Sequence, residues 1–426
     1  MVNSGDTAFV LISAALVLFM TPGLAFFYGG LVRKKNILAI MMQSFISIGI
    51  VTIIWFAVGF SLAFGPDVHG LIGNLQYAFL NGVGFSPNPA YGPTIPFLVF
   101  FCFQLMFAVI TPALITGAFA DRVTFKSYLV FLVVWSLLVY IPVAHWIWGG
   151  GFLAKMGVVD FAGGLVVHVS AGIAALASVF VVGKRIIHPG EDLRPHNIPF
   201  VALGTAMLWF GWFGFNSGSA LAANGVAAFA FANTTIAASV AMVAWFLIAW
   251  AVEKRPSFVA SMTGAVAGLA TITPAAGYVQ PWGAVLIGLF AAIICYLAIT
   301  LKTRLKWDDA LDVWGVHGVG GAVGTICLGL FASSAINGIS GLWMGDYHQF
   351  LVQLFAVILV AVYAFVATYI ALKVINIFTP VRVGEREEIE GLDVWLHGET
   401  AYLLDNQLVR AVEADTDPFL GDNRAV

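Results

Sequence analysis

The sequence predicts an all-α polytopic membrane protein with eleven transmembrane helices, arranged as two inverted five-helix repeats followed by an eleventh helix. Composition is the first observation behind this prediction. Of the 426 residues, 61% are hydrophobic and 10% are charged, whereas soluble proteins carry about 25% charged residues. The mean hydropathy is +0.95. The other two observations are a one-sided distribution of basic residues and a set of motifs that recurs in the second half.

Eleven segments are long and apolar enough to cross a bilayer, which requires about 20 residues of helix. Several of them contain Gly or Pro, which membrane helices tolerate where neighbouring helices satisfy the backbone. The expected spans are residues 8–31, 37–64, 95–119, 126–147, 162–183, 198–218, 225–252, 258–278, 281–301, 312–333 and 347–377.

Basic residues predict the orientation of these spans. Of the 19 Lys and Arg residues, 18 follow odd-numbered spans or lie in the C-terminal tail, and Lys155 is the exception. Cytoplasmic loops carry the excess of positive charge, so we expect the N-terminus outside and the C-terminus in the cytoplasm of a multi-pass cell-membrane protein. The start, "MVNSGDTAF", lacks the basic segment of a cleaved signal peptide.

An internal repeat links residues 8–183 with residues 198–333, and together with the last helix at 347–377 they define a membrane domain of residues 1–378. Because each repeat holds five spans, the second enters the membrane from the opposite side. Inverted repeats place a substrate path at their interface, near the midplane. Three features recur in matching order: Thr111-Pro112 with Thr273-Pro274, the aromatic–glycine clusters at 25–30 and 209–220, and His168 with His317.

His168 and His317 are the most informative residues, because ionisable groups deep in a span usually face the bundle interior and carry function. Small residues share a helix face with each of them: Gly164 and Gly172 with His168, Gly321 and Gly324 with His317. Such spacing lets helices approach closely, so the two imidazoles are expected to meet near the pseudo-twofold axis. The alternative is that each is a core histidine bonded to a carbonyl or to the other. No third ligand stands at metal-binding spacing, so no metal or cofactor is expected.

Acidic residues stand near the starts of the two histidine-bearing spans. Asp160 and Asp312 are expected to cap these helices, since a carboxylate there accepts from free N–H groups and favours the positive dipole end. The functional alternative for Asp160 is that its charge helps to hold a cation at the outer mouth. Asp308 and Asp309 are expected to be solvated in a basic inner loop. His145, beside Trp148, is expected to pack at the outer interface.

Five motifs, "FYGGLVRKKN", "HWIWGGG", "DFAGGLVVHVSAG", "GWFGFNSGS" and "DVWGVHGVGG", occur in order. Together they resemble the ammonium transporter family (Amt/Mep/Rh), Amt branch, of the bacterial or archaeal type, over residues 8 to about 403. The resemblance implies a homotrimer with a pore for ammonium or ammonia through each subunit, a transporter of nitrogen uptake rather than an enzyme, and no nucleic-acid partner.

The resemblance also implies roles for individual residues. An outer recruitment site would consist of an aromatic cage and a hydroxyl, with an aspartate nearby; two stacked phenylalanines would gate the pore below, and twin histidines would line it. The corresponding residues are Phe107, Trp148, Ser219 and Asp160 for recruitment, Phe107 and Phe215 for the gate, and His168 and His317 for the pore.

Elementary chemistry suits these roles. Aromatic faces attract a cation by about 0.5–2 kcal/mol per contact, but carrying a bare ion through an apolar lumen costs tens of kcal/mol in the Born limit. Deprotonating ammonium at the entrance and conducting neutral ammonia avoids that cost. A coupled pair of histidines could relay the proton separately.

The tail, residues 379–426, is charged. Its "EGLDVWLHGETAY" resembles the family's C-terminal segment, which folds against the cytoplasmic loops, couples neighbouring subunits and cooperates with a PII-type regulator; the alternative is a solvated, partly disordered tail. Two other functions compete with transport. A non-conducting ammonium sensor would signal through the tail, although no catalytic domain follows the last span, and an intramembrane hydrolase lacks a nucleophile motif.

Overall fold

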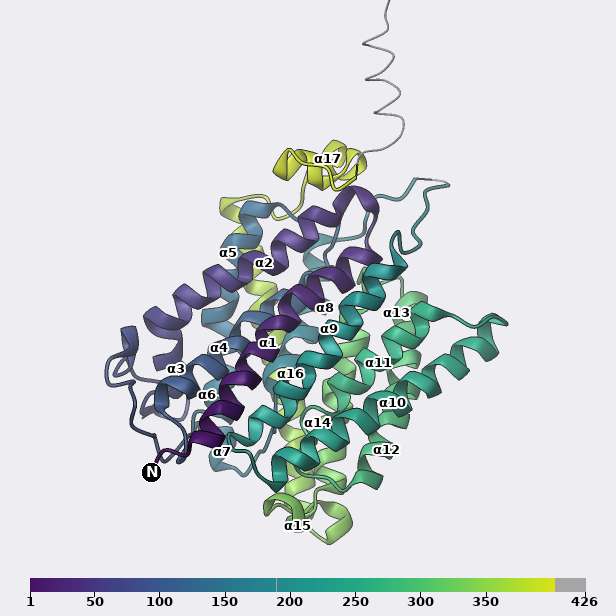
Figure 1. The fold of residues 1–426 in the computed structure, drawn as a ribbon. Helices are drawn as coiled ribbons and strands as arrows, with labels where there is room; N and C mark the ends of the chain where they lie inside the picture. Colours follow the sequence, from purple (N-terminus) through teal and green to yellow (C-terminus); the bar gives the residue numbers. More distant parts are fainter. Residues whose placement is uncertain (189, 403–426) are drawn as a thin grey trace, which may run out of the picture.

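The computed structural model describes residues 1–188 and 190–402 as a bundle of long helices, with the N-terminus and α17 at opposite ends (Figure 1). In this part of the chain ten helices are long and apolar enough to span a membrane. The predicted fold class, an all-α polytopic membrane protein, is confirmed. Residues 403–426, which include the end of the expected tail, lie outside the described residues.

Each expected span has a helical counterpart. Several consist of two or three consecutive segments because a π-helical turn interrupts the α-helix. In order, the spans are α1 (Ser4–Leu31); α2 (Ile37–Ile54), η2 (Trp55–Gly59) and α3 (Phe60–Phe64); α4 (Phe97–Ile115); α5 (Phe125–Trp135), η4 (Ser136–Tyr140) and α6 (Ile141–Ile147); η5 (Gly164–Val169) and α8 (Ser170–Val182); α9 (Ile198–Ser217); α10 (Gly225–Glu253); α11 (Phe258–Ile272); α12 (Pro281–Phe290), η7 (Ala291–Cys295) and α13 (Tyr296–Arg304); η8 (Trp314–Val319) and α14 (Gly320–Phe331); and α16 (Tyr347–Phe378).

The eighth span is shorter than expected. We expected residues 258–278, but α11 ends at Ile272 and buried turns follow, because Pro274 cannot donate the next helical hydrogen bond. The remaining elements lie in the connections: η1 (Lys34–Asn36), the hairpin β1–β2 (Asp67–Val68 and Ile72–Gly73), η3 (Ala78–Leu80), α7 (Phe152–Lys155), η6 (Gly218–Ala220), α15 (Ser334–Asn337), η9 (Leu342–Met344), α17 (Glu385–Glu390) and η10 (Asp393–His397).

Side-chain caps fix where several spans begin. Asn3, Asn224 and Asp346 each accept a hydrogen bond from the backbone N–H three residues ahead, at the starts of α1, α10 and α16. These caps replace the hydrogen bonds that the first turn of a helix cannot make internally. Short polar residues before long apolar runs therefore set the depth of each helix.

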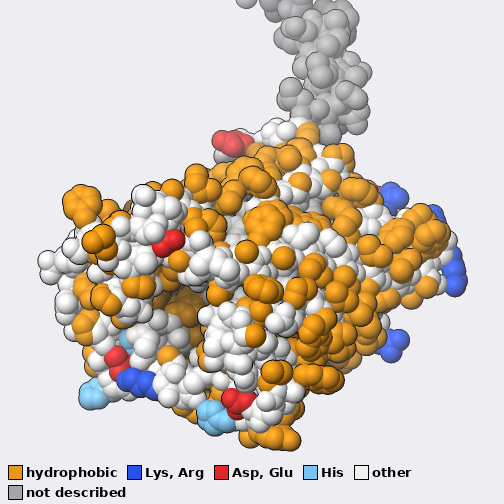
Figure 2. All heavy atoms as spheres, turned by 60° about the horizontal axis from the view of Figure 1, so that its bottom comes forward, with side chains coloured by type: hydrophobic (Ala, Val, Ile, Leu, Met, Phe, Trp, Pro, Cys, Tyr) orange, Lys and Arg blue, Asp and Glu red, His pale blue; other side chains and the backbone are white. Residues whose placement is uncertain are grey.

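Two sides of the bundle are distinguished below. The N-terminal face carries Asn3, the β1–β2 hairpin and α7, and the basic face carries the connections with Arg33, Arg122 and Arg185. Figure 2 is turned so that the N-terminal face comes forward, and it shows a hollow among mostly hydrophobic and uncharged side chains.

Matching π-helical turns support the inverted repeat. The fourth and ninth spans are interrupted by η4 and η7, and the fifth and tenth begin with η5 and η8. Each of the last two contains one of the two histidines, His168 and His317. Turns of π-helix often mark functional sites in helices. In these two pairs of corresponding spans the same local distortion recurs, whereas η2 of the second span has no counterpart in α10.

Glycines bring the two histidine-bearing spans together. A Cβ added to Gly172 would lie 2.0 Å from the backbone nitrogen of Gly318, and one added to Gly321 would lie 2.6 Å from the Gly164 carbonyl oxygen. A Cβ on Gly324 would lie 1.8 Å from the carbonyl oxygen of Thr271. The expectation that small residues beside the histidines permit close helix approach is confirmed.

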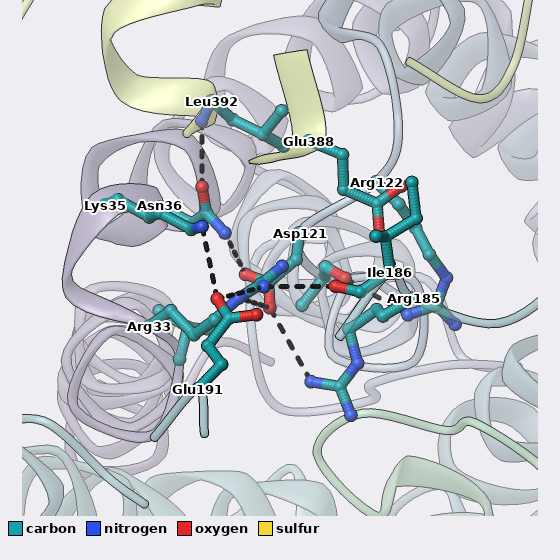
Figure 3. A network of polar contacts seen from close by, with 12 residues as sticks. Arg33, Lys35, Asn36, Asp121, Arg122, Arg185, Ile186, Glu191, Glu388 and Leu392 are labelled. Carbon is teal, nitrogen blue, oxygen red and sulfur yellow. Dashed lines mark hydrogen bonds and ion pairs between the residues drawn. The ribbon is translucent and has the colours of Figure 1, made fainter. Parts of the chain in front are cut away.

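The first part of the tail is seated in the basic face (Figure 3). The Glu388 side chain is fully buried and accepts from the Ile186 N–H at 2.6 Å and from Arg382 Nη2 at 2.8 Å. The Leu392 N–H donates to Asn36 Oδ1 at 2.8 Å, and Asn36 donates in turn to Asp121. A solvated tail was one of the alternatives. It is wrong for the part that carries the buried residues Glu388, Leu392 and Asp393, whereas residues 398–400 are exposed.

Below the tail lies a buried ionic cluster (Figure 3). Arg33 Nε donates to Asp121 Oδ2 at 2.9 Å, with side chains 6% and 0% exposed. Arg185 pairs with Asp308 at 2.7 Å; although burial opposes ionisation, these hydrogen bonds lower the pKa of Asp308 to about 2. The expectation that Asp308 is solvated is therefore wrong, because buried cations from the neighbouring connections enclose it.

Substituting Gly172 tests the helix crossing. Gly172→Ala is expected to lower the thermal midpoint of the detergent-purified protein strongly, because the added methyl has no space and overpacking costs about 1–3 kcal/mol or more. The matched control is Gly225→Ala, since a Cβ there meets nothing within 4 Å. Equal melting temperatures for the two variants would contradict the close crossing.

Candidate functional site

Three cavities follow one another from the N-terminal face to the basic face. The outer cavity, about 330 Å³, is bordered by Phe107, Trp148, Asp160 and Ser219. The middle cavity, about 10 Å³, is bordered by both histidines and Phe215. The inner cavity, about 220 Å³, shares His317 with the middle one. Side chains from both repeats thus line one path through the protein.

The outer cavity brings the expected recruitment residues together. The rings of Phe107 and Trp148 meet edge to face with centroids 5.8 Å apart. Ser219 Oγ donates to the Phe215 carbonyl oxygen at 2.9 Å, so its own lone pairs are left to accept. Phe107 comes from α4, Trp148 follows α6, and Ser219 belongs to η6. The arrangement presents aromatic faces and one hydroxyl oxygen to whatever enters.

Asp160 joins the outer cavity to the start of η5. Its carboxylate accepts from the N–H groups of Gly163, Gly164, Leu165 and Val166 at 2.7–3.1 Å. Its carbonyl oxygen accepts from Trp148 Nε1 at 2.7 Å. The capping prediction for Asp160 is confirmed, and the same residue fixes the Trp148 indole. The Asp160 side chain therefore holds the start of the helix that carries His168, and its backbone carbonyl holds the Trp148 indole.

Phe107 and Phe215 lie between the outer and middle cavities. Their ring centroids are 4.4 Å apart with an angle of 41° between the planes, so the rings are in contact but tilted rather than parallel. Both side chains are 1% exposed. In this conformation the two rings close the path.

His168 and His317 lie side by side at the middle cavity. Their Nδ1 atoms are 3.2 Å apart, and the rings are inclined by 20°. Trp212 packs against His168 on another side, at 5.6 Å between centroids. His168 Nε2 is buried without a hydrogen-bond partner. Because an Nδ1–Nδ1 hydrogen bond needs one donor and one acceptor, the two neutral rings must be in opposite tautomers.

The middle cavity is small and largely apolar. Its other walls include Leu114, Val167 and Leu208. A volume of about 10 Å³ corresponds to roughly one water molecule. A hydrated cation does not fit, whereas a molecule of the size of ammonia does.

Tyr28 and His317 separate the middle cavity from the inner one, which opens toward the basic face. The Tyr28 hydroxyl donates to the Leu114 carbonyl oxygen at 2.9 Å. Sequence reasoning missed Tyr28, and it also missed Gln104 and Tyr278 beside the outer cavity. Tyr28 belongs to the aromatic–glycine cluster at 25–30, but that pattern does not indicate which of its rings borders the path. Nothing in the local sequence distinguishes Gln104 and Tyr278 from the many other polar and aromatic residues of membrane helices.

The capping prediction for Asp312 is wrong. Asp309 occupies the position instead: its carboxylate accepts from the N–H groups of Val313 at 3.1 Å and Trp314 at 2.8 Å. Asp309 is 1% exposed rather than solvated as expected, and burial raises its pKa to about 6. Asp312 has φ of +60°, pairs with Lys302 and borders the inner cavity.

Among the described residues, no three His, Cys, Asp or Glu side chains are placed to hold a metal ion. The outer and inner cavities have mixed polar and apolar walls, and the middle cavity between them is bordered by the two imidazoles, aromatic rings and aliphatic side chains. Fold and site together define a polytopic membrane protein with a narrow, interrupted route for a small solute.

The chain belongs to the ammonium transporter family, because residues 8–402 match the model of the Ammonium Transporter Family. An ammonium transporter of Bacillus subtilis is 47% identical over 401 residues, covering 93% of this chain and 98% of the relative. Among solved structures, Mep2 of Saccharomyces cerevisiae matches with a TM-score of 0.85 at 34% identity, covering 90% of this chain and 88% of that one. A structure described as a sensor Amt protein matches with a TM-score of 0.85 at 32% identity, covering 92% of this chain and 98% of that one.

Family membership confirms that the chain is a multi-pass ammonium transporter and not an enzyme. The hydrolase alternative is therefore set aside.

Substituting Asp309 and Asp312 tests the corrected assignment of the cap. Asp309→Asn is expected to lower the thermal midpoint because a buried acceptor of two backbone N–H groups is weakened, at about 1–3 kcal/mol. Asp312→Asn is the matched control and is expected to have the smaller effect, since its side chain is 34% exposed. A larger decrease in thermal midpoint for Asp312→Asn than for Asp309→Asn would instead identify Asp312 as the cap.

Proposed function

We propose that the protein recruits ammonium at the outer cavity, removes a proton there, and conducts ammonia past the phenylalanine pair and the two histidines. The observation that carries this proposal is that the volume and the lining of the path change along its length. A large cavity with aromatic and hydroxyl groups gives way, across two touching rings, to an apolar space of about 10 Å³.

Recruitment depends on the electron-rich faces of Phe107 and Trp148 and on the oxygen of Ser219. Cation–π contacts attract a small cation by about 0.5–2 kcal/mol each. The Ser219 proton is already donated within its helix, so ammonium meets an acceptor. The four backbone bonds of the Asp160 carboxylate favour an indirect role, in which Asp160 holds Trp148 and adds negative charge close to the cavity.

The proposed deprotonation of ammonium is a consequence of the largely apolar walls of the middle cavity, which lies beyond Phe107 and Phe215. No carboxylate borders the middle cavity, and transferring an unpaired ion into such surroundings costs far more than the cage contributes. Ammonia carries no net charge and needs only the two imidazoles as hydrogen-bond partners. The barrier thus selects for a substrate that can lose a proton, which excludes potassium.

The histidine pair offers the proton a separate route. With the Nδ1 atoms 3.2 Å apart, the ring that donates through Nδ1 takes up a proton at its Nε2 and passes its Nδ1 proton to the other ring, which releases its own Nε2 proton. These three transfers together exchange the tautomers of the two rings and move one proton across the pair. The unpaired His168 Nε2 is available to receive a proton or to hold ammonia. We propose that this exchange relays the proton released at the gate.

We propose that the basic face is cytoplasmic and the N-terminal face is outside the cell, in the plasma membrane, as the positive-inside rule requires. The assignment as a homotrimer rests on the family resemblance. Exposed apolar residues on α9 and α10, among them Phe210, Leu247 and Trp250, supply surface that lipid or neighbouring subunits would cover.

We further propose that the tail, residues 379–426, regulates transport and cooperates with a PII-type protein on the cytoplasmic face. Its described part contacts the connections after three spans. The Leu392 N–H donates to Asn36, Glu388 accepts from the Ile186 N–H, and the Val383 N–H donates to the Arg122 carbonyl oxygen. Movement of the tail would therefore disturb the ends of several pore helices together.

A non-conducting sensor is the second candidate function, and the resemblance to a structure described as a sensor Amt protein keeps it in view. Transport is favoured because the histidine pair, the phenylalanine pair and the cavities on either side of them form one path in this chain.

Electrical recording from proteoliposomes under an ammonium pulse tests the proposed function. The parent protein is expected to give an ammonium-dependent current, and the double substitution His168→Ala with His317→Ala is expected to abolish it or its selectivity. His348→Ala, at an exposed histidine on the N-terminal face, serves as the control. Intact, selective current in the double variant would exclude the relay, and absence of ammonia flux and current in the parent would favour the sensor.

Substituting Glu388 tests the regulatory tail. Glu388→Ala is expected to expose the tail to limited proteolysis and to change the transport rate, because it leaves the Ile186 N–H and Arg382 without their partner. Glu399→Ala changes an exposed tail residue and is expected to resemble the parent. Release of the tail with unchanged transport would argue against a regulatory role.

A further inference from the structure

His145, in α6, is buried next to the proposed recruitment site, and both of its ring nitrogens have partners. Nδ1 lies 2.9 Å from the Ala63 carbonyl oxygen, and Nε2 lies 2.9 Å from Asp67 Oδ1. Its side chain is fully buried. The sequence-based expectation that His145 packs at the interface does not explain these two polar contacts.

The two contacts specify the protonation state of the ring. A carbonyl oxygen only accepts, and so does an ionised carboxylate. Asp67 is ionised, since hydrogen bonds from Lys155 and His145 lower its pKa to about 2. A neutral imidazole has a single N–H, so one nitrogen would face an acceptor with its own lone pair. Both contacts form only when the ring is an imidazolium.

Charged and polar neighbours are consistent with a cationic ring. Asp67 Oδ2 pairs with Lys155 of α7, whose side chain is 60% exposed, and Asp67 Oδ1 also accepts from the Gly70 N–H at 2.8 Å. From α3, the Ala63 carbonyl oxygen faces the ring of His145. The Tyr91 hydroxyl contacts the Gly149 carbonyl oxygen, at 3.4 Å, and not the ring. Among the described residues, Asp67 is the anion within hydrogen-bond distance of the ring.

The same residue organises the turn that carries Trp148. The His145 carbonyl oxygen accepts from the N–H groups of Gly149 at 3.0 Å and Gly151 at 2.9 Å. A Cβ added to Gly149 would lie 2.0 Å from the Ala63 carbonyl oxygen, the partner of the imidazole. The turn is therefore pressed against α3 by the contact that His145 makes.

The β1–β2 hairpin holds this turn from the other side. Trp146 Nε1 donates to the Leu71 carbonyl oxygen at 2.9 Å, and the Phe152 N–H donates to the Gly70 carbonyl oxygen at 2.9 Å. The His145–Asp67 ion pair fastens the same hairpin to α6. Asp67, remote from the substrate, is thereby connected to the position of the Trp148 indole.

We propose that His145 is a buried imidazolium and that its ion pair with Asp67 positions Trp148 for cation recruitment. The inference deepens the proposed recruitment site and rests on it. His145 and Asp67 are positioning residues, since neither borders the outer cavity.

The protonation state can be tested without any transport assay. Nitrogen-15 NMR of the histidine-labelled protein in lipid, with the His145 signal assigned by its loss in His145→Gln, is expected to show two protonated ring nitrogens. Asp67→Asn is expected to shift that signal toward a neutral ring. A single neutral tautomer of His145 in the parent protein would overturn the inference.

Positioning is tested by the kinetics of ammonium-driven current. Asp67→Asn and His145→Gln are expected to raise the apparent KM about two- to tenfold, the size of one weakened cation–π contact, with the maximal current retained. Asp192→Asn is the matched control, because Asp192 pairs only with Arg194 in an exposed loop on the basic face.

Trp148→Leu separates failure of this inference from failure of the recruitment site. An unchanged KM in Asp67→Asn together with a raised KM in Trp148→Leu would overturn the positioning role and leave the cage intact. An unchanged KM in Trp148→Leu would overturn the proposed cage and, with it, this inference.

Discussion

The close crossing of the two histidine-bearing spans is the constraint on which the rest of the structure depends. Gly172 lies against Gly318 with no room for a side chain between them, and this contact brings the imidazoles of His168 and His317 within 3.2 Å. A wider crossing would separate the rings and admit water. Dense packing at the centre of the bundle therefore creates the narrow, largely apolar segment that divides the outer cavity from the inner one.

Around this crossing, polar groups are placed where they hold helices without entering the path. Asp160 and Asp309 cap η5 and η8 from opposite sides, so each repeat starts its histidine helix in the same way. On the basic face, the ion pair of Arg33 and Asp121 likewise holds two connections together. Because buried charges are costly unless paired, these clusters fix the connections, and the middle cavity is bordered by uncharged groups.

Much of this arrangement could be predicted from sequence, because hydropathy, basic-residue asymmetry and small residues beside the histidines act locally. Asp312 stands next to the span in the sequence but does not cap it, because the helix begins after this positive-φ residue. A signal was present: Asp160 precedes His168 by eight positions, as Asp309 precedes His317. Tyr28 and the two contacts of His145 could not be found this way, since they depend on segments that meet only after folding.

The central claim is that ammonia and the proton pass the narrow segment separately. Comparing the ammonium-driven current of proteoliposomes in H₂O and in D₂O, at matched ammonium concentration, tests it most directly. A several-fold smaller current is expected in D₂O, because charge would then cross the segment only as fast as a deuteron passes between the histidines. An unchanged current would show that no proton transfer limits conduction, and would contradict a rate set by the histidine pair.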